Sequence, residues 1–271
     1  MLRSVLRLAM VVGVALLAST SQAASAVTTS GQWISRCNYS HTLNDDPIVH
    51  PNMPGMSHTH DFYGSKVTDG SSTGQSLLGT PTTCKTPADS AGYWVPATYK
   101  ADGTVVRAKY MLTYWIGPAT GKVVPFPVGM GLVAGNVNAT GPQSTKIIDW
   151  HCDNNTGGVL KSPHLDHPYD CTPYGGDGMI EEITFPTCWN GTGLTTADVT
   201  YTPCVKPFTK HLPKLTLRIH LGIQDPTGIT LSSGPWWTLH ADFLNAWDPA
   251  RQQQLITDCI AAHVNCGQVN S

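Results

Sequence analysis

Three histidines, His58, His60 and His240, are the residues whose type and spacing best suit them to carry chemistry. His58 and His60 are one residue apart, in a Ser-His-Thr-His-Asp-Phe run typical of the start of a strand. Because side chains alternate across a strand, both imidazoles are expected on one face, about 7 Å apart. Asp242 follows His240 at the same spacing, so we predict that these segments meet in one cleft. Three converging imidazoles suit zinc or copper, with a position left open for water or substrate.

Carboxylates accompany both histidine segments. Asp46, Asp61 and Asp242 are the candidate catalytic residues, as general bases or as groups that orient an imidazole. A glycosidase needs two carboxylates at a defined separation, and no spacing here singles out such a pair. The adjacent Glu181 and Glu182 are expected to be solvated. The alternative to a metal site is that these polar side chains join loops through buried hydrogen bonds.

Aromatic residues favour a carbohydrate partner. The chain has eight tryptophans, and most are expected in the core because tryptophan is highly buried on average. Trp189 and Trp236 lie in turn-rich segments, where an exposed indole face can stack on a sugar. We take these two, with Asn245, as candidate substrate-binding residues.

The first 26 residues have the pattern of a secretory signal peptide. Arg3 and Arg7 precede an apolar run from Leu8 to Leu17, and small residues before Ala26 favour cleavage there. Residues 27–271 are then expected to form a single secreted, monomeric domain without a membrane anchor. Loss of both arginines lowers Lys+Arg from 16 to 14, against 18 Asp+Glu, which leaves a net charge of about −4. This charge argues against a nucleic-acid partner, because phosphate binding requires a basic surface.

Eight cysteines lie in the expected mature chain, and an even number in an exported protein indicates four disulfides. Four bridges allow 105 connectivities, so the pairing of sequence neighbours is a hypothesis. The hypothetical pairs are Cys37–Cys84, Cys152–Cys171, Cys188–Cys204 and Cys259–Cys266. No C-x-x-C spacing indicates a structural zinc or redox motif.

The hydrophobic pattern predicts an all-β fold. Charged residues make up 13% of the chain, against roughly a quarter in ordinary domains, and turn-forming residues are abundant. Strands are expected over residues 33–37, 93–99, 105–115, 123–127, 129–136, 146–150, 179–185, 215–223 and 236–243. A helix is expected from Asp248-Pro249 to about His263. We predict a mainly β, single-domain β-sandwich or distorted jelly roll with long disulfide-stapled loops and one C-terminal helix.

Short motifs distributed over most of the chain carry a resemblance to a known family. They are Cys37, Asp46-Pro47-Ile48-Val49, Ser57-His58-x-His60-Asp61-Phe62-x-Gly64, Tyr93-Trp94-Val95-Pro96, Phe126-Pro127-x-Gly129, Ala134-Gly135-Asn136, Trp150-x-Cys152, Phe185-Pro186-x-Cys188-Trp189-x-Gly191 and His240-x-Asp242-Phe243-x-Asn245-x-Trp247. In this order they resemble a secreted domain-of-unknown-function family, number nineteen ninety-six, of filamentous fungi and actinobacteria. The resemblance implies a secreted, disulfide-bonded domain and does not imply a reaction.

One segment departs from the family pattern. Members usually carry Asp-His-x-x-His-Met after the Cys-Trp-x-Gly motif, whereas residues 194–201 here contain no histidine. If the family site uses those histidines, the site of this chain is reduced or altered. His164, Asp166 and His167 are candidates to replace them from another loop.

The function expected from these residues is action on, or binding of, extracellular or cell-wall polysaccharide through a metal-assisted site. An enzyme of this kind would be a polysaccharide-active hydrolase or lyase. The alternative is a secreted protein that binds carbohydrate or metal without catalysis. Zinc or copper is the expected cofactor if the histidines bind a metal.

Overall fold

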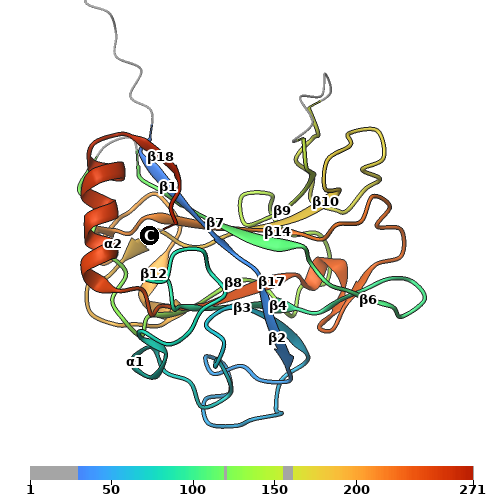
Figure 1. The fold of residues 1–271 in the computed structure, drawn as a ribbon, viewed down its shortest axis with the longest axis horizontal. Helices are drawn as coiled ribbons and strands as arrows, with labels where there is room; N and C mark the ends of the chain where they lie inside the picture. The colour runs from blue at the N-terminus through green and yellow to red at the C-terminus, as the bar shows by residue number, and fades with distance from the viewer. Residues whose placement is uncertain (1–29, 119–120, 155–160, 271) are drawn as a thin grey trace, which may run out of the picture.

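A computed structural model describes residues 30–118, 121–154 and 161–270, so the expected signal peptide lies outside the described residues. Two large sheets, of six and five strands, pack face to face (Figure 1). The predicted mainly β sandwich with one C-terminal helical segment is confirmed. Within the described ranges, no helix is both long and apolar enough to cross a membrane.

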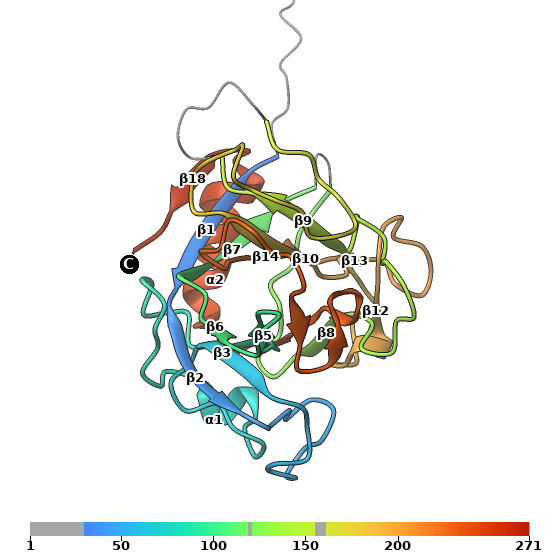
Figure 2. The same ribbon diagram turned by 90° about the vertical axis from the view of Figure 1, so that its right-hand side faces the viewer.

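The six-stranded sheet has the order β18-β1-β7-β14-β10-β9. Its strands are β1 (Gln32–Cys37), β7 (Tyr110–Ile116), β9 (Ile148–Cys152), β10 (Met179–Thr184), β14 (Lys214–His220) and β18 (Asn265–Gln268). Neighbouring strands are antiparallel except for β1 and β18, which are parallel and lie side by side in Figure 2. In β14 the alternating Leu215, Leu217 and Ile219 face the core, which leaves Arg218 and His220 on the outer face.

The five-stranded sheet is antiparallel throughout and has the order β2-β3-β4-β17-β8. Its strands are β2 (Tyr39–Leu43), β3 (His60–Gly64), β4 (Gly92–Pro96), β8 (Gly131–Gly135) and β17 (His240–Leu244). Its outer face is covered by the loop-rich segment that leads into β3, which hangs at the bottom of Figure 1.

Two small sheets and several short helices complete the fold. The strands are β12 (Val199–Thr200), β11 (Cys188–Trp189) and β13 (Lys210–His211) in one sheet, and β16 (Gly234–Pro235), β15 (Thr230–Leu231), β5 (Thr98–Tyr99) and β6 (Val105–Val106) in the other. The helices are α1 (Gly74–Leu77), the 3-10 helices η1 (Thr196–Asp198) and η2 (Trp236–Thr238), α2 (Pro249–Leu255) and the π-helical turn η3 (Ile256–Ala261). Helix α2 begins as predicted, because the Asp248 side chain accepts a hydrogen bond from the Arg251 N–H and Pro249 follows it.

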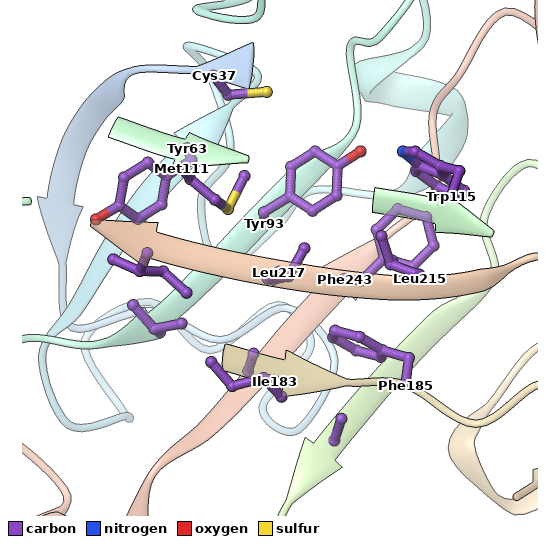
Figure 3. Packing of buried hydrophobic residues seen from close by; sticks show 14 of the residues in the cluster. Cys37, Tyr63, Tyr93, Met111, Trp115, Ile183, Phe185, Leu215, Leu217 and Phe243 are labelled. Atoms are coloured by element: carbon purple, nitrogen blue, oxygen red, sulfur yellow. The ribbon is translucent and has the colours of Figure 1, made fainter. Parts of the chain in front are cut away.

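The core between the two sheets is aromatic. Trp33 of β1 stacks on Trp115 of β7, with ring centroids 5.5 Å apart, and Tyr93 of β4 stacks on Phe243 of β17 at 5.3 Å. Trp115 meets Phe243 edge-on at 5.7 Å, which joins the two sheets (Figure 3). Five of the eight tryptophans are fully buried, as expected for most of them.

The four disulfides pair as hypothesised, Cys37–Cys84, Cys152–Cys171, Cys188–Cys204 and Cys259–Cys266, with no free cysteine in the described chain. Two of the predicted strands are wrong in part. Residues 123–127 form only an isolated bridge at Val123, because Pro125 and Pro127 cannot donate to a ladder. Residues 236–238 form η2, so the last strand of the five-stranded sheet begins only at His240.

Candidate metal centre

Strand register places His60 and His240 at the same level of the five-stranded sheet. Phe62 of β3 and Asp242 of β17 both pair with Trp94 of β4, which lies between them. His60 and His240 each stand two residues earlier and therefore share one face. That face is the outer one, because Tyr63 and Phe243, one residue on from Phe62 and Asp242, lie in the core between the sheets.

His58 completes a group of three imidazoles from the loop before β3. Its ring centroid lies 4.2 Å from that of His60 and 5.1 Å from that of His240, and the other two centroids are 5.9 Å apart. Each residue offers one ring nitrogen, and these nitrogens all lie within 4.8 Å of one another. The predicted meeting of the three histidines is therefore confirmed.

Backbone carbonyls orient two of the rings. The Nδ1 of His60 lies 3.0 Å from the Asp45 carbonyl, and the Nδ1 of His240 lies 2.8 Å from the Thr238 carbonyl. Since a carbonyl only accepts, each Nδ1 carries the proton and each Nε2 keeps its lone pair. The Nε2 atoms of His58 and His60 are buried and have no hydrogen-bond partner among the described residues. This arrangement matches metal-binding histidines, whose second nitrogen donates to a carbonyl or carboxylate.

Burial keeps the three imidazoles neutral. It lowers the pKa of His240 to about 4, and it lowers the pKa of His60 well below its usual value, with further lowering by His58 and His240. Burial and the neighbouring His50 also lower the pKa of His58. Neutral imidazole is the metal-binding form, so all three are ready to bind an ion at neutral pH.

Two of the candidate carboxylates lie beside the histidines. Ligand atoms of Asp46, His60 and Asp242 form a second group within 4.8 Å of one another. Neither carboxylate oxygen of Asp242 has a hydrogen-bond partner in the described structure, although the residue is fully buried. Burial, and then the charge of Asp46, raise the pKa of Asp242 well above its usual value. A bound cation would stabilise the ionised form of such an unpartnered carboxyl group.

Aspartates also fix the loop that supplies His58. The Asp46 carboxylate accepts the N–H groups of Ile48 and Val49, both at 2.9 Å. The Asp45 carboxylate accepts those of Gly55 and Gly70, at 2.7 and 2.8 Å. These bonds tie the loop to itself and to the segment before α1. Asp45 was not among our candidate residues, and its place in the run Asn44-Asp45-Asp46 gave no signal that its carbonyl orients His60.

The remaining candidates lie elsewhere. Asp61 follows His60 and therefore faces the opposite side of β3, where its carboxylate pairs with Arg107 and Thr42. Asn245 is 1% exposed, and its amide donates to the carbonyls of Phe126 and Pro127. Its assignment to substrate binding is therefore corrected: the side chain holds the turn before β8.

The two candidate tryptophans are half-buried and lie in different places. The Nε1 of Trp189 donates to the Gly193 carbonyl at 2.6 Å, within its own loop. Trp236, in η2, lines a small cleft of about 200 Å³ with Tyr169 and Pro226, and contacts Trp237 edge-on at 5.1 Å.

The expectation for Glu181 and Glu182 is wrong. Glu181 is fully buried, because alternation along β10 turns it to the same inner face as Met179 and Ile183. Its carboxyl accepts a hydrogen bond from Thr98 at 3.2 Å, and burial raises its pKa to about 8. Glu182 faces outward, half-buried, and accepts from Arg218 Nε at 2.5 Å.

The segment that lacks the family histidines lies on the free edge of β8. The Leu194 carbonyl accepts from the Gly131 N–H and the Thr196 hydroxyl from the Val133 N–H. The proposed replacements do not join His60 and His240. His164 instead groups with Asp149 and His151, and Asp166 pairs with its neighbour His167 at 2.7 Å.

Comparison with known proteins gives a family and no activity. A family model described as a domain of unknown function (DUF1996) matches residues 46–247. Neither the curated proteins nor the solved structures contain a match to the chain. The matched region begins at Asp46 and extends past Asp242, so it contains all three histidines and both neighbouring carboxylates.

Proposed function

The chain belongs to this family, whose function is unknown, so we propose a function from the side chains of the chain itself. That function is the binding of a transition-metal ion by His58, His60 and His240. The observation that carries the proposal is the convergence of three ring nitrogens within 4.8 Å, in rings already oriented by carbonyls. Zinc and copper are the ions that such imidazole sets favour.

The neighbouring carboxylates support the choice of a cation. Asp242 is buried without a partner in the described structure, at a cost that a nearby positive charge would offset. Asp46 and Asp242 lie beside His60. Each carboxylate can bind the ion directly or accept a hydrogen bond from a water molecule on the ion. An ion there would also tie the loop carrying His58 to β3 and β17, so binding should stabilise the fold.

Access to the site favours binding over polymer catalysis. His60 and His240 are buried, and only His58 is half-buried. An ion and a water molecule can enter the site past His58. A polysaccharide chain, in contrast, would contact little more than the His58 side chain. A bound ion would supply Lewis acidity and lower the pKa of a water molecule bound to it.

The test is metal binding by the full purified chain. Zn²⁺ and Cu²⁺ are titrated into metal-stripped protein by calorimetry, with native mass spectrometry as the count of ions. His58→Gln and His240→Gln should each weaken binding at this site on the order of 100-fold or more, because a direct ligand is lost. The matched control is His263→Asn, an exposed histidine whose φ of 56° asparagine tolerates. Unchanged affinity in both ligand variants would contradict the proposal.

Polysaccharide binding remains a second candidate, supported by the cleft beside Trp236. Half-exposed indole and phenol rings beside a cleft are a common sugar-stacking surface. The check is a glycan array with the wild type and Trp236→Ala, with Trp237→Ala as the neighbouring control. Binding that survives Trp236→Ala would remove this cleft from consideration.

Secretion belongs to the same proposal. Four disulfides are typical of proteins that fold in an oxidising compartment, and residues 1–26 have the signal-peptide pattern. Mass analysis of the protein from culture medium should give an N-terminus at Val27. A full-length product that stays inside the cell would contradict it.

A further inference from the structure

A second polar cluster lies on the outer face of the six-stranded sheet, on the opposite side of the sandwich from His60 and His240. Asp149 and His151 stand two residues apart on β9 and share its outer face, because Ile148, Trp150 and Cys152 lie in the core. His164 arrives from a segment that pairs back onto the same strand, through two hydrogen bonds between Trp150 and Leu165. Ligand atoms of Asp149, His151 and His164 all lie within 4.8 Å of one another.

The two imidazoles point to one carboxylate oxygen. The Nδ1 of His164 hydrogen-bonds Oδ2 of Asp149, and the Nδ1 of His151 lies 3.9 Å from the same oxygen. The two rings are 4.4 Å apart between centroids. The Nδ1 of His151 is buried and has no hydrogen-bond partner in the described structure, and the same is true of Oδ1 of Asp149. His151 is 5% exposed, so the polar atoms left unsatisfied here are costly unless a ligand engages them.

A cleft of about 370 Å³ opens beside this cluster. It is lined by His151, His164, His220, Arg218, Tyr110 and Asp153, among others. Its volume is in the range of small-ligand pockets. Both ring nitrogens of His220 are buried and have no hydrogen-bond partner in the part of the chain that the structure describes. The described residues of the sheet therefore leave buried imidazole nitrogens of His151 and His220 without hydrogen-bond partners.

The charged neighbours leave the cluster free to take a cation. Arg218 is neutralised by Glu182, whose Oε2 lies 2.5 Å from the Arg218 Nε. On the other side of the cleft, Asp177 is already bound to Lys109 and to the Tyr110 hydroxyl, so the group it forms with Asp153 and His220 is the weaker candidate. Asp149 has only the single hydrogen bond from His164 among its described contacts.

We propose that Asp149, His151 and His164 form a second metal site, which binds a divalent transition-metal ion with its open positions facing the cleft. Two imidazoles and one carboxylate on one side of an ion leave adjacent positions for water or a small oxygen ligand. The site differs from the three-histidine centre in its donor set and in its sheet. The two outer faces are separated by at least the spacing of two packed sheets, ~10 Å, so the sites should bind independently.

The test counts ions in variants of the full chain. Native mass spectrometry and Cu²⁺ titration of metal-stripped wild type should give two ions per chain. His164→Gln changes a side chain that is 54% exposed, and it should leave one ion and weaken binding of the second on the order of 100-fold. Asp149→Asn should do the same. His167→Gln is the matched control, because this exposed histidine is three residues further along the same loop and outside the cluster.

The outcomes separate this inference from the proposed function. One ion lost in His164→Gln and the other in His58→Gln supports both sites. If the wild type binds a single ion, and His164→Gln loses it while His58→Gln keeps it, the result supports the second site alone. Binding in His164→Gln and Asp149→Asn equal to that of His167→Gln overturns the second site, whatever happens at His58. The Cu²⁺ electron paramagnetic resonance spectrum of His58→Gln, which isolates the second ion, should show coupling to two nitrogens; coupling to three or more would also overturn it.

Discussion

The Nδ1 of His60 lies 3.0 Å from the carbonyl oxygen of Asp45, and the carboxylate of that same residue holds the N–H groups of Gly55 and Gly70. One aspartate thus orients a central imidazole with its backbone and fixes the surrounding loop with its side chain. The position of the His60 ring depends on how well this loop is held.

Replacement of Asp45 should therefore affect both stability and metal affinity. Asp45→Ala removes two hydrogen bonds to a buried carboxylate, and we expect a loss of about 2–4 kcal/mol in the free energy of unfolding. Zn²⁺ affinity should fall roughly 10-fold, as for other groups that orient a ligand. Urea denaturation and calorimetry measure the two effects. Asp102→Ala is the control, since that exposed carboxylate only closes a turn with Thr104; equal effects of the two changes would refute the role of Asp45.

The histidine cluster should make the metal-free protein sensitive to acid. Above its usual pKa of 6.5, His240 is neutral in both folded and unfolded states and makes no pH-dependent contribution. As the pH falls from 6.5 toward its folded-state pKa of about 4, only the unfolded state takes up the proton, so stability is lost. A shift of this size corresponds to about 3 kcal/mol. Denaturation between pH 7.5 and 4.5 should show a shallower loss in His240→Asn than in His263→Asn, and parallel curves would contradict this account.

Glu181 should have the opposite pH dependence. Its folded-state pKa of about 8 lies above the ordinary 4.5, so between these values the unfolded state ionises while the folded state does not. Wild-type stability should therefore fall as the pH rises from 4.5 to 8. Glu181→Gln keeps the shape and cannot ionise, so it should be more stable than wild type at pH 8, on the order of 1–4 kcal/mol, with little difference at pH 4.5.

The adjacent residue provides the control for that experiment. Glu182→Gln alters a carboxylate on the opposite face of β10 and weakens its pair with Arg218. It should lower stability at pH 8 and keep the wild-type fall between pH 4.5 and 8. A Glu181→Gln protein that is less stable than wild type at pH 8 would show that the buried carboxyl is ionised and bound by a partner.

The disulfides should contribute unequally. Cys37–Cys84 closes 47 residues and Cys259–Cys266 closes 7. In the chain-entropy model these loops correspond to about 4 and about 2 kcal/mol of stability. The double serine variant of the longer bridge should therefore have the lower midpoint in guanidinium. Thiol titration of the denatured, unreduced wild type should find no free thiol, and equal midpoints of the two variants would contradict the entropic ranking.

Spacing along strands predicted the histidine centre because period-2 alternation is local. His60 and His240 needed only a common sheet to meet, and β3 and β17 provide it, whereas His58 joins them from the loop before β3 and not from a strand as expected. The same rule applies to Asp149-x-His151 and to Glu181, which shares the face of Met179 and Ile183. However, the strand was predicted to end at residue 150, before His151, and Glu181 was expected to be solvated.

What the sequence could not predict depends on contacts between distant loops. The side-chain amide of Asn245 donates to two carbonyls that lie more than a hundred residues earlier in the chain. His164 reaches β9 through the pairing of Leu165 with Trp150. Likewise, the Asp45 carbonyl meets His60 because the loop folds back over the outer face of its own sheet. No periodic pattern records contacts of this kind.

The parallel pairing of β1 with β18 has a consequence for how the chain is made. Synthesis runs from β1 toward β18, so after β7 has been made and before β18 is made, β1 has β7 on one side and an open backbone edge on the other. Until residues 265–268 arrive, that edge can pair with another chain. Nascent or truncated forms ending at α2 should therefore associate through the open edge of β1. The Cys259–Cys266 disulfide links η3 to β18 and so helps to hold β18 at that edge.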